Sequence, residues 1–78
     1  MRSAETTARE LIARALQVAA EQVPADAGID TYEKWDSLNH LRIVEELEKH
    51  LGRPLETEEV LAIVDLATLA GVLGSAAR

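Results

Sequence analysis

The segment with the clearest chemical potential is a short polar turn, Asp36-Ser37-Leu38, that leads into an amphipathic stretch. Asp36 is a good N-cap residue, because its carboxylate can accept hydrogen bonds from backbone N–H groups of a first helical turn. Ser37 would then occupy the first helical position, with its hydroxyl in solvent. The dipole and the unpaired N–H groups of a helix N-terminus favour a negatively charged substituent. The segment therefore predicts a serine whose phosphoester would be stabilised in place.

Two other chemistries have to be weighed for this segment. Asp36, Ser37 and His40 are the residue types of a hydrolytic triad, but neighbours on one short helix lack the convergent geometry that a triad needs. We expect no catalytic residues and no enzyme activity. His40 and His50 lack an obvious co-ligand, so we expect surface histidines and no metal site. A serine at a helix start can also be purely structural, and this alternative stays open on local sequence alone.

An apolar stripe follows Ser37 and predicts the helix that carries it. Its members recur at spacings of three and four residues, the period of one helix face: Leu38, Leu41, Val44, Leu47 and Leu51. The pattern predicts a helix from Ser37 to about Leu51. Gly52 is placed to end it in a left-handed conformation, and Pro54 prevents its continuation.

A first helix is predicted upstream. Thr7 and Glu10 can form a capping box, although Ser3 could start the helix one turn earlier. The helix is expected to reach about Glu21, because Pro24 stops it. Its apolar residues follow the i, i+3, i+4, i+7 pattern: Ala8, Leu11, Ile12, Ala15, Leu16 and Ala19. Residues 24–36 then form a loop, which we expect four apolar side chains to pin across the bundle: Val23, Ile29, Tyr32 and Trp35.

Two further helices are predicted near the C-terminus. Thr57 begins a short helix with acidic residues in its first turn, which suits the helix dipole. The expected buried residues of this part are Leu55, Val60, Leu61, Ile63 and Val64. Asp65 is a plausible N-cap for a last helix, whose inner face is expected to hold Leu66, Leu69, Ala70 and Leu73, with Val72 beside it. Residues 74–78 are expected to fray.

The composition limits the class of protein. The 78 residues predict a single domain, 1–78, of the all-α class: a small bundle of three longer helices and one short helix around an aliphatic core. The absence of cysteine excludes disulfides and thiolate metal sites. The net charge of −6 argues against nucleic acid and anionic membranes, and favours basic protein partners. Without an apolar run of ~18 residues or a signal-peptide pattern, a cytoplasmic protein is expected.

Asp36-Ser37-Leu38 at a helix start, in a small acidic chain of helices, resembles the acyl carrier protein family and its peptidyl carrier relatives. The resemblance covers nearly the whole chain. It implies a four-helix bundle in which Ser37 receives 4′-phosphopantetheine from coenzyme A and holds cargo as a thioester on that arm. The implied partners are a phosphopantetheinyl transferase and the ligases, synthases or transferases that load and use acyl or aminoacyl cargo.

The resemblance also implies a docking face for these enzymes. In this family, acidic residues of the second helix dock against basic patches, so Glu46 and Glu48 are expected to dock. Asn39, His40 and Arg42 follow the attachment point closely and are expected to contact partners as well.

Several positions depart from the family pattern. Lys34 and Trp35 replace a glycine and an aliphatic residue that often precede the motif, and we interpret Trp35 as a packing anchor. Asn39 and Arg42 stand where fatty-acid carriers usually have acidic residues, and Glu45 where an apolar residue often lines the cargo cavity. These departures favour a stand-alone carrier dedicated to one pathway, such as polyketide, peptide, aminoacyl or modified-sugar assembly, over a housekeeping fatty-acid role. We expect the carrier to be a monomer. The alternative is a helical protein-interaction module without a prosthetic group.

Overall fold

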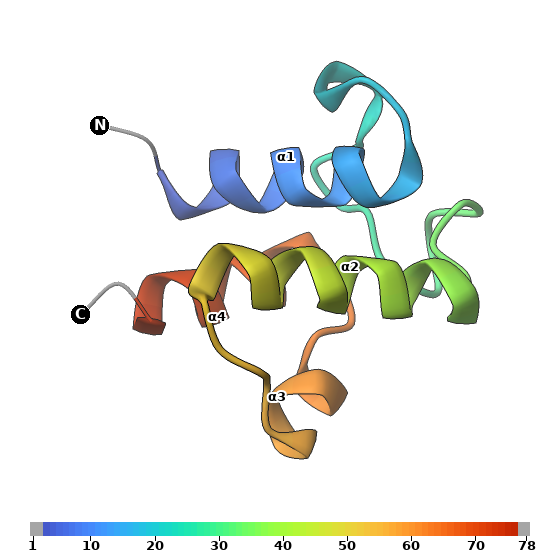
Figure 1. Ribbon diagram of the computed structural model, residues 1–78. Coiled ribbons are helices and arrows are strands. Elements are labelled where there is room, and N and C mark those ends of the chain that lie inside the picture. The colour runs from blue at the N-terminus through green and yellow to red at the C-terminus, as the bar shows by residue number, and fades with distance from the viewer. Residues whose placement is uncertain (1–2, 77–78) are drawn as a thin grey trace.

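Four α-helices and one turn of 3₁₀-helix form the described part of the chain, residues 3–76, in this computed structural model (Figure 1). The elements in order are α1 (Ala4–Leu16), η1 (Ala20–Gln22), α2 (Ser37–Leu51), α3 (Thr57–Ala62) and α4 (Leu66–Ala76). The predicted all-α bundle of three longer helices and one short helix is confirmed. None of the described helices is long and apolar enough to cross a membrane.

The first helix ends earlier than predicted. Ser3 caps its start, the earlier of the two predicted starts. Its end at Leu16 contradicts the predicted end near Glu21, because Gln17 adopts a left-handed conformation with φ of 59° and closes the helix there. The Gln17 N–H reaches the carbonyls of residues 13 and 14, so the last turn is satisfied well before Pro24.

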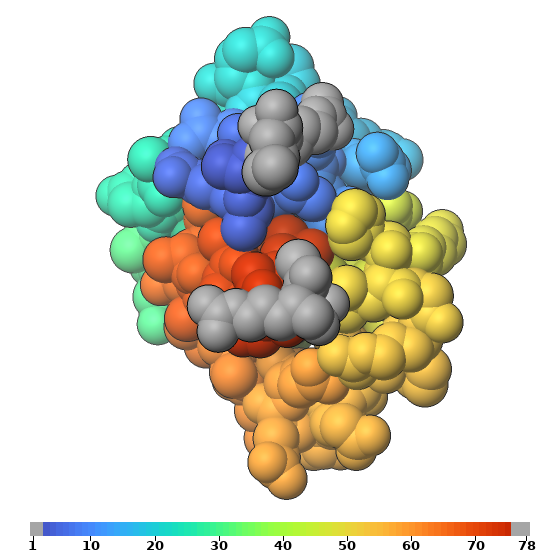
Figure 2. All heavy atoms as spheres, turned by 90° about the vertical axis from the view of Figure 1, so that its left-hand side faces the viewer, coloured from blue at the N-terminus to red at the C-terminus, as the bar shows by residue number. Residues whose placement is uncertain are grey.

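Helix α1 packs against both α2 and α4 and runs antiparallel to them (Figure 1). Seen from the side where α1 begins, the last turns of α4 lie between α1 and α3, with the end of α2 beside them (Figure 2). The buried cluster is aliphatic apart from Trp35, as the composition predicts. Its members are Ala8, Leu11, Ile12, Ala13, Ala15, Val23, Ala27, Trp35, Ile43, Leu47, Ile63, Leu66, Leu69 and Leu73.

The loop before α2 is held by its backbone as well as by side chains. Val23 and Trp35 are buried and Tyr32 is half-buried, but the predicted anchor Ile29 is 38% exposed, and Ala27 is buried in its place. The reason lies in a short antiparallel bridge between residues 27–29 and 64–66, closed by N–H to O distances of 2.9 and 2.8 Å. Gly28 suits this bridge, because a Cβ there would lie only 3.0 Å from the Cβ of Asp65 and from the carbonyl oxygen of Val64.

Several predicted core residues are exposed instead. Leu38 and Leu41 of the predicted stripe are 60% and 58% exposed, because the buried face of α2 is set by Ile43, Val44 and Leu47. At 3.6 residues per turn, the first two leucines lie on the other side of the helix. Of the residues predicted to be buried between Leu55 and Val64, only Ile63 is fully buried, whereas Leu61 and Val64 are 73% and 44% exposed.

The last helix largely follows the prediction. Asp65 caps it, since its Oδ1 accepts the Thr68 N–H at 2.8 Å. The inner face is confirmed, with Leu66, Leu69 and Leu73 buried. The prediction that the chain frays from residue 74 is wrong for residues 74–76, because α4 continues to Ala76. Residues 77–78 lie outside the described part.

Candidate functional site

Ser37 is the first residue of α2, as predicted, and its side chain is exposed. Asp36 is its N-cap: the Asp36 Oδ1 accepts the Asn39 N–H at 2.8 Å, and the Asp36 carbonyl accepts the His40 N–H at 2.8 Å. Among residues 3–76, no side chain is hydrogen-bonded to the Ser37 hydroxyl or to the N–H groups of Ser37 and Leu38. The serine oxygen therefore lies free at a helix N-terminus that retains unpaired donors.

Two hydrogen bonds tie the loop before Ser37 to the first turn of α2. The indole Nε1–H of Trp35 donates to the Nδ1 of His40 at 3.1 Å, and the two rings are stacked with centroids 6.2 Å apart. The Asn39 amide Nδ2 donates to the Lys34 carbonyl at 2.8 Å. Asn39 and His40, expected as docking residues, are both half-buried in these contacts.

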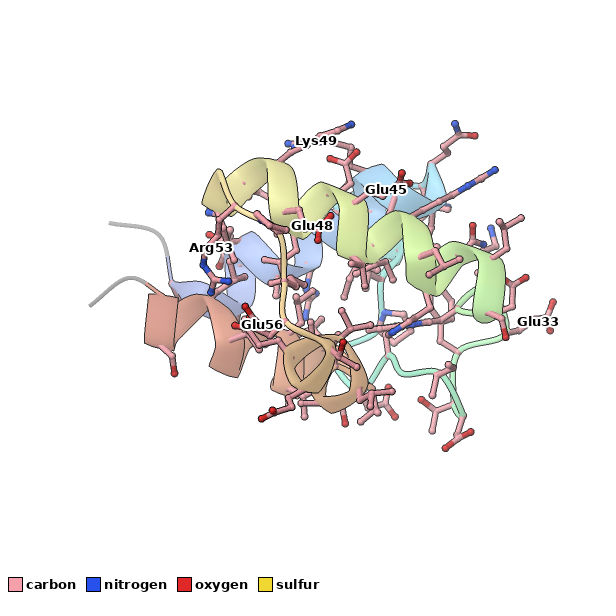
Figure 3. The ribbon with its side chains drawn as sticks, turned by 60° about the horizontal axis from the view of Figure 1, so that its bottom comes forward. Glu33, Glu45, Glu48, Lys49, Arg53 and Glu56 are labelled. Atoms are coloured by element: carbon pink, nitrogen blue, oxygen red, sulfur yellow. The ribbon has the colours of Figure 1, made fainter. Side chains whose placement is uncertain are left out.

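The acidic residues expected to dock lie further along α2. Glu46 pairs with Arg14 of α1 at 3.4 Å and with Lys49 at 3.6 Å, and its side chain is only 16% exposed. Glu48 is half-buried and accepts the Leu55 N–H at 2.8 Å. In Figure 3, Glu33 lies near the start of α2, and Arg53 and Glu56 lie toward its other end. At about 1.5 Å per residue, Glu46 and Glu48 lie roughly 14–17 Å along the axis from Ser37.

The outer face near the serine carries apolar side chains and charges of both signs, since Arg42 and Glu45 are both exposed there. Leu38 and Leu41, two members of the predicted apolar stripe, are exposed there, and Arg42 is exposed beside them. Their positions on the helical wheel, opposite Ile43 and Leu47, place them together on the solvent side of the first two turns. One feature of the sequence could have indicated their exposure. Ile43 is apolar but lies outside the predicted stripe, and the buried face of α2 is turned toward it.

The His, Asp and Glu residues of the described region do not form a group of three or more that could hold a metal ion. One open cleft of about 490 Å³ is lined by Arg53 and residues of α3 and α4, and no α2 residue lines it. The site around Ser37 is therefore a surface from which an attached group would extend into solvent.

The helical bundle and the unpaired serine hydroxyl at the N-terminus of a long helix fit a helical carrier domain. The family model described as "phosphopantetheine attachment site" matches residues 7–73, and the chain belongs to this family. The family is defined by a covalently attached 4′-phosphopantetheine. Its carrier domains are not themselves catalytic, and they interact with phosphopantetheinyl transferases and acyl-loading enzymes. No curated protein matches this chain.

Proposed function

We propose that Ser37 is the attachment point of 4′-phosphopantetheine and that this chain is a stand-alone carrier of acyl, aminoacyl or peptidyl groups. One observation carries the assignment: Ser37 is the only serine within the matched residues 7–73, and its hydroxyl is exposed and unpaired. Of the other serines, Ser3 caps α1 and Ser75 lies near the end of α4, both outside the match.

The residues around Ser37 fit a phosphodiester. A negative charge on the Ser37 oxygen would face the unpaired N–H groups of the first turn, which the helix dipole makes favourable. The carboxylate of Asp36 is engaged by the Asn39 N–H. Ser37 is exposed, so a group attached to its oxygen starts from the surface and can reach a partner enzyme.

The prosthetic group supplies a thiol, which this cysteine-free chain lacks, and that thiol holds the cargo as a thioester. The chain itself supplies recognition and tethering. Docking of the carrier on an enzyme raises the effective concentration of the cargo at that enzyme's active site.

The face that would dock is the exposed outer side of the first turns of α2. Leu38 and Leu41 offer apolar contact, and Arg42 offers a positive charge beside them. This face suits an enzyme surface with an apolar recess and a carboxylate near it. Glu46 and Glu48 add less to docking than the sequence suggests, because their carboxylates are engaged within the molecule.

The test is conversion of the folded protein with coenzyme A and a broad-specificity phosphopantetheinyl transferase, followed by intact mass measurement and peptide mapping. We expect the mass of one phosphopantetheine on the peptide that contains Ser37. Ser37→Ala should abolish the addition, and Ser75→Ala should not change it. Wild-type protein that stays unmodified with several transferases would contradict the proposal and favour an interaction module without a prosthetic group.

A further inference from the structure

The residues on either side of Ser37 are bonded to one another across it. Lys34 and Trp35 precede the cap, Asn39 and His40 follow the serine, and each of the two hydrogen bonds spans five residues. We propose that this pair of contacts, the Ser37 clasp, positions the serine for its transferase. The proposal rests on attachment at Ser37, and it assigns Trp35 and His40 a role as positioning residues.

One member of the Ser37 clasp, Trp35, is anchored in the core. Trp35 is 1% exposed and belongs to the core cluster, so its ring is fixed by packing. Its Nε1–H meets the half-buried His40 ring, which stacks on the indole with an angle of 25° between the planes. The first turn of α2 is thereby held to the core through His40. If the acceptor were lost, a donor of a buried side chain would be left unpaired, which proteins avoid.

The hydrogen bond also requires one tautomer of the His40 ring. An indole N–H can only donate, so the Nδ1 that accepts it carries no proton, and the neutral ring has its proton on Nε2. The second contact holds the loop to the helix start, because the Asn39 side-chain amide donates to the carbonyl of Lys34 at 2.8 Å. Loop and helix start thus form one unit with Ser37 at its exposed point.

The functional consequence concerns how often Ser37 is presented correctly. Without the clasp, the loop residues next to the cap and the first turn would sample more conformations, only a fraction of which fit a transferase. The apparent affinity of the carrier then falls by that fraction. The maximal rate, which reports chemistry in the bound complex, stays the same. Loss of the clasp should therefore raise the KM for the carrier and leave kcat unchanged.

The experiment compares variants of the folded chain that lacks the prosthetic group, using steady-state modification by a transferase and coenzyme A. His40→Leu removes the acceptor and should raise KM about fivefold, the factor expected for one neutral hydrogen bond, with kcat within twofold. His40→Asn keeps an acceptor one atom from Cγ and should restore KM. His50→Leu, at the other end of α2, is the matched control and should behave like wild type.

Trp35 separates the clasp from direct contact of His40 with the transferase. Because Trp35 is buried, Trp35→Phe cannot act through direct contact with the transferase. It should raise KM as His40→Leu does, and the double variant should be no worse than either single one. If His40→Leu fails to fold, Trp35→Phe tests the same bond. Nitrogen-15 spectra of the wild-type imidazole, which need no variant, should show the Nε2–H tautomer in the neutral ring.

The outcomes are distinct. Modified wild type together with unchanged KM in His40→Leu and Trp35→Phe overturns the clasp and leaves the attachment proposal standing. An Nδ1–H imidazole, or His40→Asn as impaired as His40→Leu, also overturns it. Wild type that no transferase modifies refutes the attachment at Ser37 itself.

Discussion

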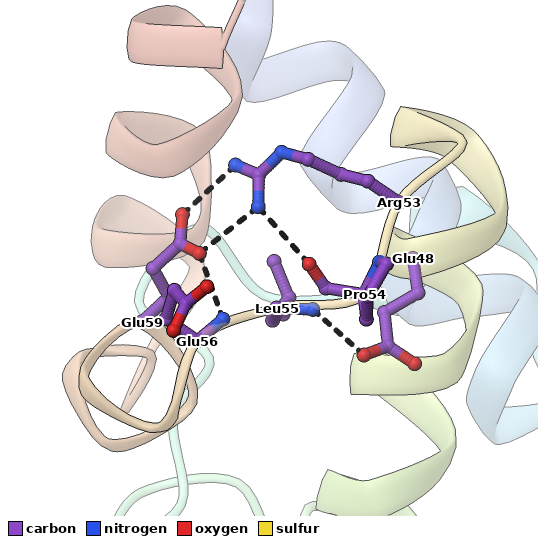
Figure 4. A network of polar contacts seen from close by, with 6 residues as sticks. All are labelled: Glu48, Arg53, Pro54, Leu55, Glu56 and Glu59. Carbon is purple, nitrogen blue, oxygen red and sulfur yellow. Dashed lines mark hydrogen bonds and ion pairs between the residues drawn. The ribbon is translucent and has the colours of Figure 1, made fainter.

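Arg53 and Glu59 form a bidentate ion pair, with Nη1 to Oε1 and Nη2 to Oε2 both at 3.0 Å (Figure 4). The same Nη1 donates to the carbonyl of Pro54, and Glu59 also accepts the Glu56 N–H at 2.9 Å. Beside this pair, Glu48 of α2 accepts the Leu55 N–H. The segment between α2 and α3 is therefore fixed by two carboxylates, one from each helix.

This relationship predicts how stability depends on acid. The hydrogen bond from Arg53, aided by the Glu56 N–H, lowers the pKa of Glu59 from 4.5 to about 2. A carboxyl with a lower pKa in the folded state stabilises the fold fully above its unfolded pKa, and this contribution is lost as the pH falls. Glu59→Gln should thus unfold at a lower temperature than wild type at pH 7. The two midpoints should converge between about pH 4.5 and 2.

Glu58 offers the control, since it lies in the same first turn of α3 and is exposed. Thermal unfolding of Glu58→Gln should differ little from wild type over the whole range. A gap between Glu59→Gln and wild type that persisted unchanged at pH 2 would show that the carboxylate charge is not what holds the segment.

How much of this molecule the sequence predicts depends on how local each feature is. Asp36 and Gly52 bound α2 through contacts within a few residues, and both ends of that helix are predicted correctly. The end of α1 is not, because Gln17 takes a left-handed conformation that non-glycine residues seldom adopt. The bond between Trp35 and His40 also escapes prediction, since it depends on how the indole is buried.

The exposed leucines escape prediction for another reason. A periodic pattern shows that a helix has an apolar side, but α1 and the other elements packed on α2 decide which residues that side contains. Six apolar positions follow Ser37 within about four turns, and at about 3.6 residues per turn they point over more than half of the helix circumference, more than one buried face can hold: Leu38, Leu41, Ile43, Val44, Leu47 and Leu51. The two left outside are the ones nearest the proposed attachment point.

A matched pair of truncations in α2 tests this division. Leu47 is fully buried, so Leu47→Ala should lower the free energy of unfolding by about 2–5 kcal/mol. Leu41→Ala makes the same chemical change in the same helix at an exposed position, and should stay within about 0.5 kcal/mol of wild type. Urea unfolding of the three proteins measures both values. Similar losses for the two variants would place Leu41 in the core and remove it from the proposed docking face.

The proposed docking face makes Arg42 a determinant of partner choice. Its neighbour Glu46, four residues on, is engaged by Arg14 and Lys49, and Arg42 itself is exposed. An exposed ion pair would contribute only a few tenths of a kcal/mol to stability in any case. Enzymes that serve acidic carriers present basic surfaces, and like charges brought together at an interface can cost several kcal/mol. Arg42 would then repel such enzymes and suit a partner with a carboxylate opposite.

Arg42→Glu should therefore leave the thermal midpoint nearly unchanged while altering rates on the phosphopantetheine-bearing protein. The rate with a fatty-acid pathway enzyme should rise, and the rate with the carrier's own loading enzyme should fall. Lys49→Glu makes the same change of charge seven residues further along α2, where it should shift both rates much less. If Arg42→Glu moves neither rate beyond twofold, or if Lys49→Glu moves them equally, total charge or another face governs docking. Reversal of one charge at an interface changes mainly the rate of association, because electrostatic steering acts on the encounter of the two proteins. The change in rate caused by Arg42→Glu should therefore be large enough to measure.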